Sequence, residues 1–192
     1  MTDPDQPTCP ALTGPCPGLA GDGAAPTAPP ATTTGPLTAA AVTTDPRVRA
    51  MGVLLTTSAL VERVLGAAIQ QAAGISHSMF EVLLILADQP GGTPMSRLSG
   101  PLVLTSGGAT RLVDRMVEAG LVSRAPSPSD RRVQLVSMTE LGERTLVAAA
   151  AAHIREAERL LFAGLPATEA EAVVSGLDEL GRRARAALPP LG

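Results

Sequence analysis

The hydrophobic positions of the chain predict a series of helices with one short hairpin among them. Apolar residues recur at helical spacing from Asp45-Pro46 to about Ala73, and Gly74 ends the pattern. Asp45 suits the N-cap of a helix, and Pro46 suits the first helical position because its fixed φ is already helical. The pattern therefore predicts a long first helix.

Three shorter helices are predicted after the first. Ser78 and Glu81 have the spacing of a capping box, which opens a helix over 79–87. A second short helix is expected to begin at Thr93-Pro94. A third is expected to begin near 105–106 and to run to Ala119, where a glycine follows it.

The pattern changes after this third short helix. Two short runs that contain β-branched residues, 121–125 and 133–138, flank a cluster of turn formers at 126–130. This arrangement predicts a β-hairpin. Beyond it, Thr139 is placed to cap a long Ala-rich helix to about 163, and a second capping box opens a final helix over 168–188. The fold class is therefore mainly α with a small β-wing.

The composition agrees with a helical core. Hydrophobic residues make up 45 % of the 192 residues, but aromatic residues only 1 %, namely Phe80 and Phe162. The core must therefore be built from Leu, Val, Ile, Ala and Met, and Ala and Leu favour helices.

Residues 1–44 differ from the rest of the chain. They are rich in Pro, Thr, Gly and Ala, contain no Arg and show no hydrophobic period, so we expect a disordered tail before a domain at 45–192. Both cysteines, Cys9 and Cys16, lie in this tail. Two cysteines without further ligands are a poor zinc signal, and they give the domain no disulfide framework.

Charge is unevenly distributed. The net charge is −3, but the stretch from Arg97 to Arg132 holds six arginines and three acidic residues. Local positive charge in an acidic protein favours a confined contact with nucleic acid over indiscriminate binding.

The sequence contains few motifs of other classes of protein. The chain lacks a Gly-x-Ser-x-Gly elbow, a phosphate-binding loop with Lys and a paired-histidine motif, so no enzyme is expected. No metal or cofactor is expected either, since His77 and His153 are far apart in sequence. There is no signal-peptide pattern, and no run that approaches the length of a membrane span. We therefore expect a cytoplasmic protein.

Two short helices followed by a hairpin with a basic tip form the layout of a winged helix-turn-helix. On the helix near 106–119, Leu112, Val113 and Met116 are expected to face the core, while Arg111 and Arg115 lie one turn apart and can face DNA. The alternative is that the two arginines pair with acidic neighbours on the same helix. The small residues at 106–109 would let the helix N-terminus approach phosphate closely.

The run TRLVDRMVEAGLVSR at 110–124, with SDRRV at 129–133 and MTELG at 138–142, resembles the MarR (multiple antibiotic resistance regulator) family. This resemblance implies a winged helix-turn-helix region at 76–139. It also implies a homodimer formed by the helices at 45–75 and 140–188, bound to a pseudo-palindromic operator of double-stranded DNA.

The resemblance also assigns residues to DNA contacts. Asp130 would shape the wing turn and Arg132 would reach the minor groove, with Arg131 beside it. Gly100-Pro101 departs from the family pattern, and the third helix of the family should be short or irregular here. The complete set of DNA-binding candidates is Thr105, Ser106, Gly107, Thr110, Arg111, Arg115, Asp130, Arg131 and Arg132.

Members of this family commonly bind small, often phenolic, effectors between the dimer helices and the winged region. The corresponding candidates are Met51, Leu55, His77 and Met79. Each has a simpler interpretation, because Met and Leu at helical spacing usually belong to a core and His77 could cap a helix. His153 is expected at the surface.

The predicted function is a sequence-specific transcriptional regulator, a homodimeric repressor that a small molecule releases from its operator. The alternative is a winged-helix module that binds another protein and has no specific DNA site.

Overall fold

The computed structural model describes residues 38–89, 91–98, 102 and 106–188. The chain divides into two units, Met1–Val61 and Glu62–Gly192, and each is considered by itself. Most of the predicted tail, the Gly100-Pro101 departure and Thr105 lie outside the described residues.

The described part of the first unit is helical. Helix α1 (Ala39–Thr44) is capped by Thr38, whose hydroxyl accepts a hydrogen bond from the Ala41 N–H at 3.2 Å. This short helix lies inside the segment predicted to be disordered, and there the prediction is wrong. Three consecutive alanines and a good N-cap favour the helix. No residue from 38 to 61 is buried.

Helix α2 (Pro46–Ala73) has the predicted bounds. Asp45 accepts a hydrogen bond from the Arg47 N–H at 2.8 Å, which confirms the N-cap, and Gly74 has a φ of 70° at the other end. The Arg47 side chain also bonds the carboxylate and holds the pKa of Asp45 well below its usual range. Asp45 therefore stays ionised at the positive end of the helix dipole.

Helix α2 is also long and apolar enough to span a membrane, by length and composition alone. The expectation that no run approaches that length is therefore wrong. The continuous stretch was missed because Thr and Ser interrupt its apolar residues. An exposed apolar helix of this kind also suits pairing with a protein partner.

In the second unit, helix α3 (His77–Ala87) starts two residues earlier than predicted. Ser76, and not Ser78, is the N-cap, and its hydroxyl accepts a hydrogen bond from the Met79 N–H at 3.3 Å. The capping box of Ser78 with Glu81 is therefore wrong. Both serines have a local pattern suited to capping, and only the position of the preceding turn distinguishes them.

A two-residue strand, β1 (Thr93–Pro94), replaces the predicted start of the second short helix. Only Met95–Arg97 form a helical turn there, the 3₁₀ segment η1. Thr93 pairs with Val136 and Pro94 with Leu135. This segment therefore adds a third, short strand to the hairpin strand β3 (Gln134–Met138). Local sequence patterns do not contain that distant partner.

Helix α4 (Ser106–Glu118) ends as predicted. Gly120 has a φ of 69°, its N–H donates to the Val117 carbonyl at 2.9 Å, and the Leu121 N–H donates to the Met116 carbonyl at 2.9 Å. This pair of bonds is a Schellman motif, which turns the chain into strand β2 (Val122–Pro126).

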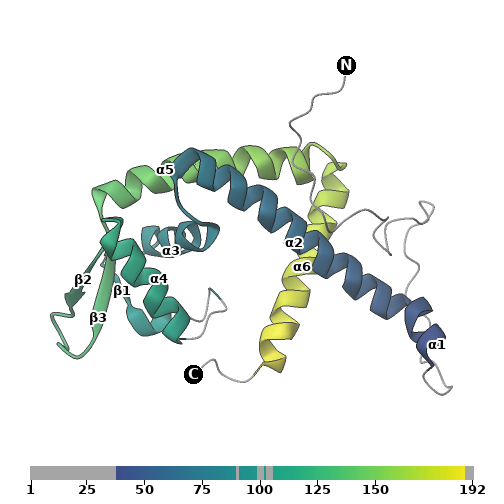
Figure 1. Ribbon diagram of the computed structural model, residues 1–192, viewed down its shortest axis with the longest axis horizontal. Coiled ribbons are helices and arrows are strands. Elements are labelled where there is room, and N and C mark those ends of the chain that lie inside the picture. The colour runs from purple at the N-terminus through teal and green to yellow at the C-terminus, as the bar shows by residue number, and fades with distance from the viewer. Residues whose placement is uncertain (1–37, 90, 99–101, 103–105, 189–192) are drawn as a thin grey trace, which may run out of the picture. The chain divides into compact units, whose positions relative to one another are not determined.

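The predicted hairpin is confirmed. Strands β2 and β3 are antiparallel, with Val122 opposite Met138 and Pro126 opposite Gln134, and the sheet order is β1-β3-β2. Figure 1 shows the hairpin projecting beside α4 as a wing.

Helix α5 (Glu140–Ala157) follows the wing and is capped by Thr139, as predicted. The π-helical segment η2 (Glu158–Phe162) extends it, and α6 (Ala167–Ala187) then departs at 109°. The predicted capping box at Thr168 is not formed, because α6 already begins at Ala167, with Pro166 as its cap and no side-chain cap bond. Proline supplies a fixed φ at this position.

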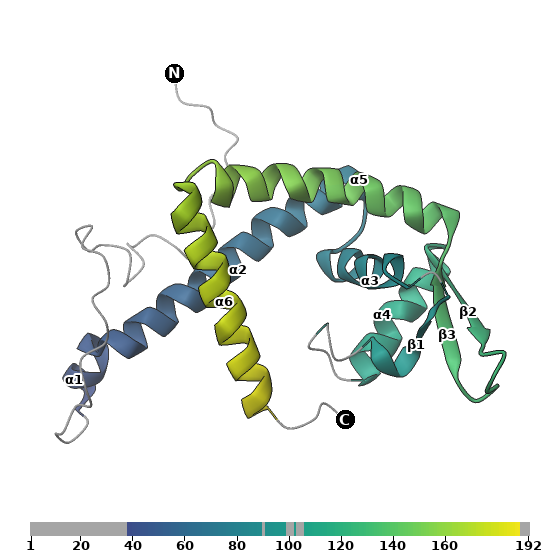
Figure 2. The same ribbon diagram turned by 180° about the vertical axis from the view of Figure 1, so that it is seen from behind.

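The core of the second unit lies between α3, α4, α5 and the sheet. Figure 2 shows α3 lying between α4 and α5, and these helices contact each other. Phe80 is buried, whereas Phe162 is 51 % exposed, so the core is almost entirely aliphatic, as the composition indicated. The side chains with the least exposure are Ile69, Val82, Leu83, Leu98, Val113, Met116 and Val136.

Candidate nucleic-acid interface

Helix α4 separates apolar and basic residues onto different sides. Leu112, Val113 and Met116 are buried in the core, as predicted. Arg111 and Arg115 are exposed one turn apart on the solvent side. The helix therefore presents two guanidinium groups outward while its other face anchors it.

The alternative in which these arginines pair with acidic neighbours is not observed. Asp114 pairs with Arg124 of β2, with 2.5 Å between Nη1 and Oδ1. Within the described part of the chain, neither Arg111 nor Arg115 makes an ion pair. Their charges are thus available to an external anion.

The wing turn is organised by Asp130. Its side-chain Oδ1 accepts the Arg132 N–H at 3.0 Å, and its carbonyl accepts the Val133 N–H at 2.9 Å. This is an Asx-type turn, in which a short carboxylate bonds the backbone two residues on. Arg131 and Arg132 are exposed at the turn and have no ion-pair partner among the described residues.

The start of α4 contributes backbone rather than side chains. Gly107 is exposed, and a Cβ placed on it would meet no described atom within 4 Å, so packing within the chain does not require a glycine there. An open helix N-terminus favours contact with phosphate. Thr110, on the next turn, is also exposed, while for Ser106 only the backbone is described.

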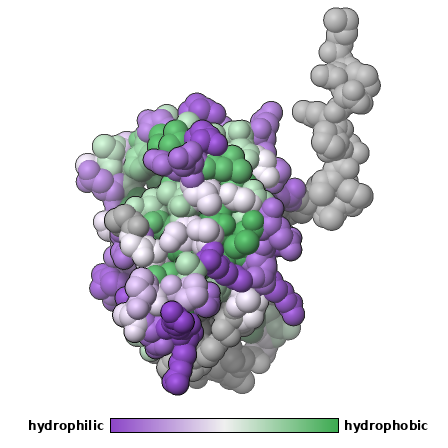
Figure 3. Space-filling model, turned by 90° about the vertical axis from the view of Figure 1, so that its left-hand side faces the viewer, coloured by the Kyte–Doolittle hydropathy of each residue, from purple (hydrophilic) through white to green (hydrophobic). Residues whose placement is uncertain are grey.

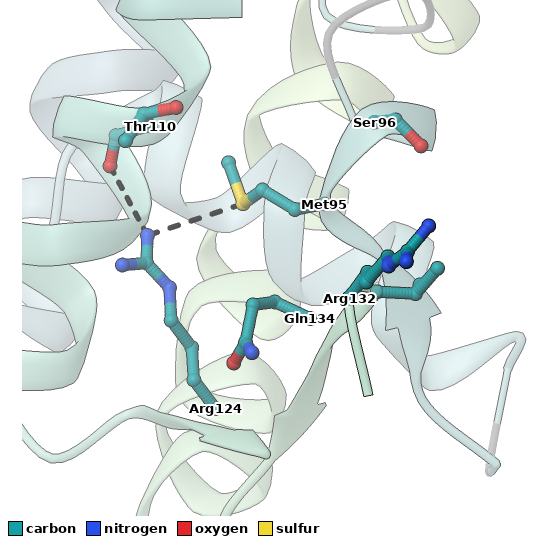
Figure 4. Close-up of a pocket in the computed structure, with 7 residues that line it drawn as sticks. Met95, Ser96, Thr110, Arg124, Arg132 and Gln134 are labelled. Atoms are coloured by element: carbon teal, nitrogen blue, oxygen red, sulfur yellow. Dashed lines mark hydrogen bonds between the residues drawn. The ribbon is translucent and has the colours of Figure 1, made fainter. Parts of the chain in front are cut away.

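A pocket of about 390 Å³ opens between η1, α4 and the wing. Arg124 reaches from β2 toward Thr110 and Met95, while Arg132 and Ser96 lie on another side of the pocket (Figure 4). Two guanidinium groups and several hydroxyl and amide groups therefore line one concave surface. Its walls are Met95, Ser96, Thr110, Arg124, Arg132, Val133 and Gln134.

The face of the molecule that carries the hairpin is mixed in polarity. Figure 3 shows hydrophilic side chains projecting from the edges of this face around a smaller apolar area. Nucleic-acid interfaces are wetter and more polar than protein interfaces, so the hydrophilic groups of this face suit such a contact.

A cluster of rings forms where α3 meets α5. The ring centroids of His77 and His153 are 5.9 Å apart, and the Phe80 ring is 5.2 Å from His153 and 6.0 Å from His77. Glu62 of α2 bonds His77 Nδ1. His153 is half-buried against these rings and not on the open surface as expected. This burial lowers the pKa of His153, with the charge of His77 as a further cause.

His77 therefore has a different role from the predicted cap. Its ring bonds Glu62, while Ser76 caps the helix. Met79 is half-buried against the core. Met51 and Leu55 are exposed and belong to the first unit. Among the described residues, no group of three or more His, Cys, Asp and Glu side chains is arranged to hold a metal.

Two features of the site were not predicted. Arg124 was counted only as local charge, yet it joins the wing to α4, and its spacing to Asp114 follows no helical rule. The approach of His153 to His77 comes from the packing of α5 on α3, which sequence periodicity does not reveal.

These elements define the class of protein. A two-helix unit with an outward-facing basic second helix, followed by a basic wing, is a winged helix-turn-helix. Residues 75–133 match the family model described as MarR family. The winged helix-turn-helix segment of the chain therefore matches the MarR family, as the sequence resemblance indicated.

Comparison with known proteins agrees. The chain is 36 % identical over 69 residues to the "Uncharacterized HTH-type transcriptional regulator YhbI" of Bacillus subtilis, a match that covers 36 % of this chain and 45 % of that protein. The chain thus spans less than half the length of this curated relative.

Solved structures match over more of their length. CouR from Rhodococcus jostii RHA1, bound to p-coumaroyl-CoA, is 26 % identical with a TM-score of 0.61, and the match covers 72 % of this chain and 94 % of that one. Sco3205 from Streptomyces coelicolor, in complex with DNA, is 23 % identical with a TM-score of 0.66, covering 73 % and 87 %. The second likeness shows the fold alone.

Proposed function

We propose that this chain is a transcriptional regulator that binds double-stranded DNA through α4 and the wing. The observation that supports it most directly is the set of four exposed arginines, Arg111, Arg115, Arg131 and Arg132, none of which forms an ion pair within the described residues. Arginine suits this task because its planar fork binds both phosphate and guanine bidentately.

The positions of the exposed arginines on α4 and the wing support an assignment of individual contacts. Arg111 and Arg115 project from the helix that would enter the major groove, and Thr110 and the backbone at Ser106 and Gly107 lie toward its N-terminal end. Arg131 and Arg132 extend from the wing, which would reach the flanking backbone or minor groove. Thr105 remains a prediction from sequence.

We further propose that the chain acts as a homodimer on a pseudo-palindromic operator. Helix α6 has 21 residues, of which only Ala170 is buried, and it exposes Val173, Leu177 and Leu180 along one stripe. An amphipathic helix is stabilised mainly by packing of its apolar stripe, so a second copy of the chain is the simplest partner for α6. Twofold symmetry would place half-sites about 10 bp apart.

Repression and release by a small molecule complete the proposal. A dimer on a promoter excludes polymerase, which is the simplest form of regulation, and the matched structure of CouR carries p-coumaroyl-CoA. In this chain, His77 and Met79 are the proposed effector contacts inside the second unit, and Met51 and Leu55 remain predictions from sequence. The proposed location is the cytoplasm.

The experiment is fluorescence anisotropy with a labelled duplex from the promoter region of the chain's own gene. Replacing Arg111, Arg115 or Arg132 with alanine should each weaken binding about tenfold or more, as for the loss of one good phosphate or base contact. Arg155→Ala is the matched control, because it removes one exposed positive charge from α5. Equal affinity for all four variants and wild type would contradict the contact assignment.

The competing function, a winged-helix module for a protein partner, gives a different outcome. Such a module would bind neither the promoter duplex nor an unrelated duplex of equal length at low salt. The exposed and unpaired state of the arginines favours DNA, since protein interfaces usually desolvate such groups only when they are paired.

A further inference from the structure

Arg124 connects the wing to helix α4 and to η1 by three contacts. From strand β2, its Nη1 donates to Asp114 Oδ1 at 2.5 Å, and its Nη2 donates to the Thr110 carbonyl at 3.3 Å. The same Nη2 lies 3.9 Å from the sulfur of Met95 in η1. Figure 4 shows the side chain crossing from the strand to these two elements. One guanidinium group thus ties together β2, α4 and η1.

The environment of Arg124 differs from that of the exposed arginines. Its side chain is 27 % exposed, and its Nε atom is buried without a hydrogen-bond partner in the described part of the chain. A side chain held by a carboxylate, a carbonyl and a thioether has little freedom to follow a DNA backbone. Its contacts are internal, so its influence on DNA binding is indirect.

Its ion-pair partner occupies a sensitive position. Asp114 lies on α4 three residues after Arg111 and next to Arg115, and its side chain remains 48 % exposed. At a spacing of three, an Asp and an Arg on one helix can pair. Without Arg124, Asp114 would be free to bind Arg111 and would also place a negative charge close to the phosphates.

We propose that Arg124 is a positioning residue for DNA binding, a role that rests on the proposed function. By holding the Asp114 carboxylate toward the wing, it leaves Arg111 and Arg115 unpaired and fixes the wing against α4. The basic face of α4 therefore depends on an ion pair that does not touch DNA. Charge-assisted bonds of this kind fix geometry as well as charge.

The test is a cycle of variants, with affinity for the promoter duplex measured over a range of salt concentrations. Arg124→Ala should weaken binding about tenfold, and it should reduce the slope of log K against log salt by about one, because one phosphate-binding arginine becomes engaged by Asp114. Adding Asp114→Asn to this variant should recover at least a few-fold of affinity and restore the slope. Asp114→Asn alone should stay within about threefold of wild type.

The outcomes distinguish the possible errors. If the double variant binds no better than Arg124→Ala, Asp114 does not compete for the arginines and the proposal is wrong. If the slope stays reduced in the double variant, Arg124 itself contacts phosphate, which also overturns it. Wild-type protein that fails to bind any duplex would instead contradict the proposed function.

A second variant controls for the possibility that Arg124→Ala does not fold. Arg124→Lys keeps the positive charge beside Asp114 but cannot bond the carboxylate and the Thr110 carbonyl with one planar group. It should therefore keep the wild-type salt slope and lose a few-fold in affinity. A reduced slope in a folded Arg124→Lys protein, judged by its thermal unfolding, would contradict the charge-holding role.

Discussion

The winged region and helix α6 use their apolar residues in opposite ways. In α3, Phe80, Val82, Leu83 and Leu86 are buried among side chains of α4, α5 and the sheet. In α6, a helix about twice as long, only Ala170 is buried and the larger apolar side chains are exposed. The winged region therefore packs into a core completed by α5 and the end of α2 of the same chain, whereas α6 needs a surface that a single chain does not provide within the described residues.

This difference relates stability to function. A well-packed winged region can present Arg111 and Arg115 in a fixed geometry, since Leu112, Val113 and Met116 of the same helix are buried in the core. A helix that depends on association can instead set the distance between two such regions. We expect mutations in the first to change folding and mutations in the second to change assembly.

The largest effect is expected at Gly142, where the wing meets α5. A Cβ at this position would lie 2.1 Å from the Leu121 carbonyl oxygen and 2.8 Å from Met138 Cγ. The carbonyl belongs to the backbone and cannot move aside easily, so Gly142→Ala should lower the free energy of unfolding by about 3 kcal/mol. Chemical denaturation of the winged region measures this value.

Glycine at position 176 of α6 provides the control for that substitution. A Cβ there meets no described atom within 4 Å, so Gly176→Ala should raise stability by up to about 1 kcal/mol through helix propensity. If both substitutions lowered the free energy of unfolding equally, the contrast between the packed winged region and the exposed helix α6 would be wrong.

A smaller effect is expected from Leu177, which is 48 % exposed on α6. Leu177→Glu should leave the winged region folded but raise the dimer dissociation constant at least about tenfold, because a charge would enter an apolar interface. Sedimentation equilibrium gives the constant, and Ser175→Glu, which adds the same charge at an exposed position of α6 away from the apolar stripe, reports the effect of charge alone. An unchanged association would show that α6 is not part of the interface.

The smallest effect concerns pH and arises where α5 packs against α3 of the winged region. Burial beside the His77 and Phe80 rings lowers the pKa of His153 from 6.5, with the charge of His77 as a second cause and Glu62 opposing the shift. The unfolded chain therefore binds more protons than the folded one just below that value. Stability should be complete above about pH 7 and should fall as the pH drops through 6.5 and lower.

The variant His153→Gln checks this account of the pH dependence. It removes the titrating ring but keeps a polar side chain, and thermal unfolding between about pH 7 and pH 5 should then vary less with pH than in wild type. If stability depended on pH equally in both proteins, the pH dependence would come from groups other than His153.

Much of the fold could be predicted from the sequence because its signals are local. The N-cap of α2, the Schellman end of α4, the hairpin and the Thr139 cap of α5 depend on residues within a few positions of each other. Local errors at the caps of α3 and α6 shift the start of a helix by a residue or two, whereas the larger error occurs where a distant partner decides the structure. Strand β1 at Thr93–Pro94 exists because β3 offers it hydrogen bonds, and no local pattern contains that information.

In the candidate site, too, local features could be predicted from the sequence and tertiary contacts could not. The outward position of Arg111 and Arg115 follows from helical spacing, and the Asp130 turn follows from its neighbours in sequence. The ion pair of Arg124 with Asp114 and the approach of His153 to His77 are tertiary contacts between different elements. Sequence therefore identified the groups that face outward and missed those that position them.

The salt dependence of DNA binding tests the central claim most directly. The affinity of the wild-type protein for the promoter duplex should fall linearly as log K against log salt, and Arg111→Ala and Arg115→Ala should each make the slope shallower by about one. Arg155→Ala should leave the slope unchanged. An affinity that does not change with salt, or slopes that are equal in all four proteins, would contradict a DNA interface built on α4.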